Sequence, residues 1–203
     1  MKVIFLIFSF LFGIQSICSS QEYFDNKQLK LYQEILDLYP AELVSDFPKA
    51  SDKKNVVLTD FAFPKGKCLS HIHIGFSFDN SEIDSLKKVL ETNAKDIYHL
   101  SDTCLISLPY DYNELRIINS DTATVCKDSH ALPIPNFKRW RLDFTDDFYK
   151  NATIYVMDAK KGNFLNEDYL SKYGVGLSKE WLHGYTKGVT IFKNYAIYWL
   201  EVW

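Results

Sequence analysis

The run from Cys68 to Phe78 (CLSHIHIGFSF) alternates regularly along its length and gives the clearest strand signal in the chain. Side chains two residues apart on a strand point to the same face. One face is expected to carry Cys68, Ser70, Ile72, Ile74, Phe76 and Phe78, and the other Leu69, His71, His73, Gly75 and Ser77. The pattern therefore predicts a strand that buries its first, more apolar face against a core.

Two pairs of β-rich runs predict antiparallel hairpins. Asn55–Phe63 is rich in β-branched and aromatic residues, and a short turn beginning at Pro64 joins it to the alternating run. Near the end of the chain, Gly188–Phe192 and Tyr195–Trp203 flank the dipeptide Lys193-Asn194. The last run holds too many aromatic side chains to leave in water, so we expect this hairpin to pack on the sheet or on helices.

Apolar residues at spacings of three and four predict two helices. The first covers Asn26–Tyr39, with Asn26 as its cap and Pro40 as its end, and the second covers Ser81–Thr92, with Ser81 as its cap. The order of helix, strands, helix and strands predicts an α+β fold. We expect a single domain over residues 21–203, with a largely antiparallel sheet and two or three packed helices.

The first twenty residues have the layout of a secretory signal peptide. Lys2 is followed by the apolar run Val3–Ile14 and the mostly small or polar stretch Gln15–Ser20. The apolar run is shorter than the roughly 20 residues that a membrane-spanning helix needs. We therefore expect cleavage of residues 1–20 and a secreted or periplasmic product. A lipid anchor on Cys18 is the alternative, and we expect no other membrane contact.

Charge and cysteine content narrow the function classes. The net charge of −3 argues against nucleic-acid binding, which depends on an excess of Lys and Arg. Cleavage leaves Cys68, Cys104 and Cys126, and no Cys-x-x-Cys zinc pattern is present. An odd number of cysteines in an exported chain leaves at least one free thiol or forms an intermolecular bond. We expect one disulfide and one buried thiol, or three buried thiols, and the sequence does not select a pair.

His71 and His73 are the first candidate site. Their spacing on a strand lets both imidazoles reach one divalent metal ion such as zinc, with His130 of the Pro-rich segment as a third ligand and an Asp or Glu as a fourth. The local pattern superficially resembles a cupin metal strand but lacks the downstream acid. The alternative is that both histidines lie on the solvent side of a half-buried strand.

The stretch Trp181–Gly188 (WLHGYTKG) is the second candidate site. Gly184 and Gly188 allow close approach of a ligand or another chain, and aromatic and polar side chains beside them would line a shallow pocket. The candidate ligand-binding residues are Trp181, His183, Tyr185 and Lys187. The alternative is a structural loop that Trp181 and Tyr185 anchor to the core. Asp143, Asp146, Asp147 and Asp158 are a third, acid–base candidate.

The C-terminal stretch resembles a group of uncharacterised secreted bacterial proteins. The residues that carry the resemblance are Asp158-Ala159-Lys160, Gly162 and Phe164, the segment WLHGYTKG and the ending YAIYWLEVW. The group shares a Trp-x-His-Gly-Tyr-Ser/Thr-x-Gly segment and a Tyr/Trp-rich last strand. The resemblance implies export from a bacterial cell and transfers no activity.

No catalytic or cofactor motif stands out in the sequence. We find no Gly-x-Ser-x-Gly elbow, phosphate-binding loop or dinucleotide fingerprint. We therefore expect an exported, non-catalytic domain that binds an unknown protein or small ligand, with no bound cofactor. The alternatives are a metal-dependent hydrolase centred on His71 and His73, and an immunity or inhibitor protein.

Overall fold

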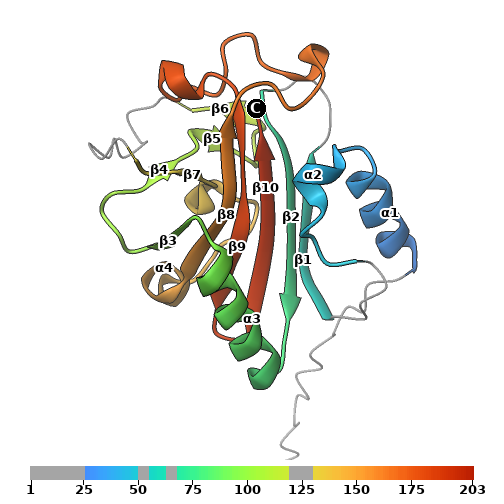
Figure 1. Cartoon of the computed structure of the whole chain (residues 1–203), viewed down its shortest axis with the longest axis vertical. Helices are drawn as coiled ribbons and strands as arrows, with labels where there is room; N and C mark the ends of the chain where they lie inside the picture. Colours follow the sequence, from blue (N-terminus) through green and yellow to red (C-terminus); the bar gives the residue numbers. More distant parts are fainter. Residues whose placement is uncertain (1–25, 50–54, 63–67, 119–129) are drawn as a thin grey trace, which may run out of the picture.

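The computed structural model describes residues 26–49, 55–62, 68–118 and 130–203. Within these residues six strands form one antiparallel sheet in the order β1-β2-β10-β9-β8-β3 (Figure 1). The strands are β1 (Asn55–Ala62), β2 (Ser70–Ser77), β3 (Asp96–His99), β8 (Thr153–Lys161), β9 (Gly184–Phe192) and β10 (Tyr195–Val202). The predicted α+β class with a largely antiparallel sheet is confirmed.

Helices and short elements cover both faces of this sheet. The α-helices are α1 (Asn26–Leu36), α2 (Ala41–Val44), α3 (Asn80–Asn93) and α4 (Asp146–Asn151). The short strands are β4 (Ile106–Ser107), β5 (Tyr110–Asp111), β6 (Arg116–Ile117) and β7 (Pro133–Ile134). The 3₁₀ turns are η2 (Phe137–Arg139), η3 (Glu167–Tyr169) and η4 (Lys179–Trp181). The Pro-rich segment, residues 130–147, contains β7, η2 and the start of α4.

The sheet separates two hydrophobic clusters. Helices α1, α2 and α3 pack on the face that includes Ile72, Ile74 and Phe76 of β2. Helix α4 and the short elements before it pack on the opposite face, which includes Trp199 and Trp203. Because both faces are covered, the alternation along β2 separates two buried layers rather than a core from solvent.

Both predicted hairpins are present, but β9 begins earlier than predicted and α3 has a different capping residue. Strands β1 and β2 pair antiparallel, as do β9 and β10 on either side of Lys193, which adopts a φ of 54°. Strand β9 begins at Gly184, four residues before the predicted start, so most of the presumed loop is strand. Helix α3 is capped by Asp79 rather than Ser81: Asp79 accepts from Glu82 N, and the Glu82 side chain accepts from Asp79 N.

Two of the cysteines differ in state. Cys104 is disulfide-bonded and Cys68 is a half-buried free thiol, which excludes three free thiols. Cys18, Cys126 and the expected signal peptide lie outside the described residues. No helix within the described ranges has both the length and the apolar character needed to cross a bilayer.

Asp158 of β8 bonds to β9 and to the connection between α3 and β3, and it should make the stability of the protein pH-dependent. It accepts hydrogen bonds from Lys95 Nζ and from the Tyr185 hydroxyl of β9. Burial raises the pKa of Asp158, but these two donors outweigh it and hold the pKa below its ordinary value. A lowered folded-state pKa gives stability that is present above the unfolded pKa of about 3.9 and is lost as the pH falls through the folded value.

The expected result is that Asp158→Asn flattens the acid limb of the stability curve. Urea midpoints measured from about pH 6 to pH 2 should fall less steeply in the variant than in the unmodified protein. Asp84→Asn is the control, because Asp84 is an exposed carboxylate on α3 whose partner is the exposed Lys87. Equal slopes for Asp158→Asn and the unmodified protein would contradict the expectation.

Candidate metal centre

Strand register brings four ionisable side chains together on one face of the sheet. Asp60 of β1 lies opposite His73 of β2, and Glu201 of β10 lies opposite His71. The two histidines are two residues apart on β2 and therefore share a face, as the alternation predicts. Three neighbouring strands thus contribute Asp60, His71, His73 and Glu201 to one cluster.

The cluster is buried, which corrects one expectation. The side chains of His71, His73 and Glu201 have 0% exposure, and that of Asp60 has 11%. The interpretation of His71 and His73 as solvent-facing residues is therefore wrong. The physical reason is the second layer over this face, which includes Tyr112 and Trp140 and is formed by short elements with little periodic pattern.

Three polar atoms of the cluster face one another. His71 Nε2 lies 3.3 Å from Asp60 Oδ2, and His73 Nδ1 lies 3.9 Å from the same oxygen. All three atoms lie within 4.8 Å of one another. Each is buried and has no hydrogen-bond partner within the described part of the chain. An unpartnered buried polar atom costs about 1–3 kcal/mol, and an ion in contact with all three atoms would remove this cost.

Glu201 and Tyr112 form a hydrogen-bonded group at the second ring nitrogen of His73, Nε2. His73 Nε2 lies 2.6 Å from Glu201 Oε1, and the Tyr112 hydroxyl donates to the same oxygen at 2.9 Å. When Nδ1 of an imidazole binds a cation, its Nε2 carries the proton and donates it to a neighbouring acceptor. Glu201 is placed to accept that hydrogen bond and so to orient the ring toward Asp60.

Burial disfavours charge on both partners of this hydrogen bond. Burial, followed by the nearby His71 and Arg141, lowers the pKa of His73 well below its ordinary value. Burial also raises the pKa of Glu201; the Tyr112 hydrogen bond opposes this shift and Asp60 adds to it. A neutral imidazole is the form of histidine that binds metal ions, so the environment of His73 favours the ligating form.

Aromatic rings and one arginine close the site. Trp140 stacks on His73 with ring centroids 3.9 Å apart and planes at 13°, and Tyr112 lies edge-on to both imidazoles. Arg141 Nη1 lies 3.2 Å from Asp60 Oδ1, which leaves Oδ2 for the two histidines. The rings cover the imidazoles and fix their planes, so the three converging atoms form a pre-organised set.

The donor set defines the kind of ion that fits. Two imidazole nitrogens and one carboxylate oxygen suit zinc and other divalent transition metals better than calcium or magnesium, which prefer oxygen ligands. Ligand atoms at the zinc distances of about 2.0–2.2 Å lie roughly 3.3–3.6 Å apart around a tetrahedral ion. His71 Nε2 and Asp60 Oδ2 already have this separation at 3.3 Å, whereas His73 Nδ1, at 3.9 Å from the same oxygen, would have to move closer. His130 lies outside this group of three: its side chain is exposed and Asp60 takes its expected place.

The second candidate site does not form one surface. Trp181 is 9% exposed and packs on Trp203 on one face of the sheet, whereas Tyr185 belongs to the cluster on the other face. Lys187 is 6% exposed; its ammonium group pairs with Asp46 at 2.7 Å and donates to the Glu42 carbonyl at 2.9 Å. His183 is partly buried between them along the chain. The arrangement favours the structural alternative for this stretch.

Asp60, Glu201 and Tyr112 were not among the expected site residues. Asp60 and Glu201 have a weak signal in the sequence, because each is a charged residue within an otherwise β-branched and aromatic run. A charge in the middle of a strand buried on both faces needs a partner. That argument becomes available only once both faces of the sheet are known to be covered.

Comparisons with models of protein families, with curated proteins and with solved structures found no match for this chain.

Proposed function

We propose that this protein is an exported domain that binds one divalent transition metal ion, zinc or a similar ion, through Asp60 Oδ2, His71 Nε2 and His73 Nδ1. The observation that carries the proposal is the convergence of three buried atoms that have metal-ligand chemistry and no hydrogen-bond partner among the described residues. Glu201, which also accepts a hydrogen bond from Tyr112, contacts His73 Nε2, and Arg141 pairs with Asp60 Oδ1. Such outer partners orient metal ligands and strengthen them.

Export is part of the proposal and has separate support. The disulfide at Cys104 fits an oxidising compartment, because cytosolic thiols are usually kept reduced. The expected leader and the resemblance to secreted bacterial proteins point the same way. A bacterial periplasmic or extracellular location is therefore proposed together with metal binding.

The test is metal titration of the purified chain after treatment with a chelator. We expect one zinc ion per chain by calorimetry and a rise in the midpoint of thermal unfolding of about 5 °C or more at a hundredfold excess over the dissociation constant. Cobalt should give the absorption of a site with nitrogen ligands. His71→Gln should abolish stoichiometric binding of both ions.

His99→Gln is the matched control, because His99 is exposed and lies away from the cluster on β3. It should bind zinc like the unmodified protein. The proposal fails if no stoichiometric ion binds, or if His71→Leu raises stability while the unmodified protein gains none from zinc. That second outcome would identify a hydrogen-bonded core cluster with no metal role.

A metal-dependent hydrolase is a second candidate, and one observation favours it. Three protein ligands leave a coordination position open, as in catalytic rather than closed structural zinc sites. Zinc-dependent hydrolysis of activated esters that is lost in His71→Gln would support this function. Zinc binding without any hydrolysis supports a binding role alone.

A further inference from the structure

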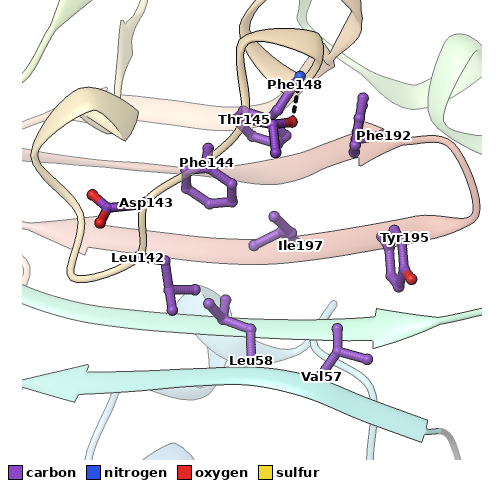
Figure 2. Close-up of a pocket in the computed structure, with 10 residues that line it drawn as sticks. All are labelled: Val57, Leu58, Leu142, Asp143, Phe144, Thr145, Phe148, Phe192, Tyr195 and Ile197. Atoms are coloured by element: carbon purple, nitrogen blue, oxygen red, sulfur yellow. Dashed lines mark hydrogen bonds between the residues drawn. The ribbon is translucent and has the colours of Figure 1, made fainter. Parts of the chain in front are cut away.

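A pocket lies on the same sheet face as the metal centre, two residues further along β1 and β2. Leu58 and Ile197 contribute to it from β1 and β10, and both lie opposite Gly75 of β2. The segment of residues 142–148 passes over these strands and closes the pocket from the other side (Figure 2). The pocket is partly open to solvent and has a volume of about 240 Å³.

The interior of the pocket is largely aromatic. Phe144 and Phe148 stack with centroids 4.0 Å apart, and Phe192 meets Phe148 edge-on at 5.4 Å. The Thr145 hydroxyl accepts a hydrogen bond from Phe148 N (Figure 2). The interior therefore fits an apolar group.

The rim of the pocket is unusually apolar for an exposed surface. Val57, Leu142 and Tyr195 line the pocket and are 52%, 44% and 37% exposed. A hollow surrounded by exposed apolar side chains is typical of a binding site rather than of ordinary surface. The hollow and the rim together indicate that a ligand buries part of itself here.

The charges at the mouth of the pocket determine whether a cationic or an anionic ligand is favoured. Asp143 lines the pocket, Asp146 lies three residues further along the same segment, and neither has an ion-pair partner within the described residues. Lys193, which lies over the ring of Phe192 at 4.9 Å, is paired with Asp147 at 2.6 Å. The Asp143 carboxylate points away from the centre of the pocket (Figure 2). It therefore acts on a charge held at the mouth, and the faces of the aromatic rings also attract cations.

We propose that this pocket binds an organic cation whose apolar body is about the size of two fused aromatic rings. A cavity of about 150 Å³ holds benzene, so 240 Å³ accommodates a larger body of this kind. The apolar body fills the aromatic interior, and the cationic group stays in water beside Asp143 and Asp146. This site is separate from the metal centre and does not depend on the function proposed above.

The experiment compares two probes of similar shape and opposite charge, 1-naphthylmethylammonium and 1-naphthoate. Calorimetry at low ionic strength should show the cation binding at least about fivefold more tightly, as expected for exposed charges. In the double variant Asp143→Asn/Asp146→Asn the two probes should bind almost equally. Asp84→Asn, which removes an exposed carboxylate on α3, should leave the ratio unchanged.

Nuclear magnetic resonance locates the probe. The ring signals of Phe192 and Tyr195 should shift on addition of the cation, and those of Trp181 should not. Equal or tighter binding of 1-naphthoate overturns the charge selection, and the absence of binding of either probe at millimolar concentration overturns the site. Both measurements use chelator-treated protein, so their failure leaves the metal proposal unaffected.

Discussion

Replacing Gly188 with alanine should destabilise the protein by about 3 kcal/mol, at the upper end of the cost of overpacking a core. Gly188 lies in the middle of β9, opposite Trp199 of β10 and Val156 of β8. A Cβ atom placed there would lie 2.5 Å from Trp199 Cζ2 and closer still to the backbone oxygen of Tyr155. Neither neighbour can move, because Trp199 is fully buried and donates to Thr190, and the oxygen belongs to the sheet.

Gly75→Ala is the matched control for this prediction, since Gly75 lies in the same sheet. Its nearest neighbours would be side-chain atoms, Leu58 Cβ at 3.0 Å and Val57 Cγ2 at 3.4 Å. Side chains at an edge strand adjust more easily than a backbone oxygen, so we expect a loss of about 1 kcal/mol or less. Urea unfolding followed by tryptophan fluorescence measures both variants. Equal losses would show that the Trp199 and Tyr155 contacts are not the cause.

Replacing Glu201 with alanine should cost about 3 kcal/mol in the metal-free protein. The substitution removes the shared acceptor of His73 Nε2 and the Tyr112 hydroxyl and leaves a cavity in a fully buried place. Removal of one partner from a buried polar pair leaves the other without solvent or protein contact, which is the expensive case. Denaturant unfolding in the presence of a chelator gives the value, and a loss below about 1 kcal/mol would contradict it.

Glu201→Gln separates the contribution of this residue to stability from its contribution to zinc affinity. Glutamine keeps the shape and the acceptor oxygen, so stability should change much less than in the alanine variant. Zinc affinity should nevertheless fall about tenfold, because a cation on His73 Nδ1 favours the carboxylate form of Glu201 as acceptor for Nε2–H, and glutamine cannot supply that charge. Glu180→Gln is the control, since Glu180 is an exposed carboxylate paired with Lys161. Unchanged affinity in Glu201→Gln, with binding lost in His71→Gln, would show that Glu201 does not support the metal ligands.

The alternation of β2 was enough to predict which of its residues share a face. Period-two patterning is strong there, and the structure places Ile72 and Ile74 in one cluster with His71 and His73 opposite them. The hairpins and the fold class follow from the same kind of local signal. Local pattern thus placed the two histidines side by side but did not show what lies over them.

The rest of the site depends on relations between distant segments. The pairing of Asp60 with His73 depends on hairpin register, which the composition of the connecting turn does not fix. Tyr112 and Trp140 come from short elements without helical or strand periodicity, so nothing local predicts that they cover the histidines. His130 was a reasonable third ligand by residue type, but topology supplies Asp60 instead.

The position of β10 has a consequence for the order in which the protein can form. This strand is the last element of the chain, yet it lies in the centre of the sheet, between β2 and β9. The β1–β2 pair therefore cannot join the rest of the sheet until β10 has been made. A nascent chain that has not yet reached β10 lacks the strand that connects the two parts of the sheet.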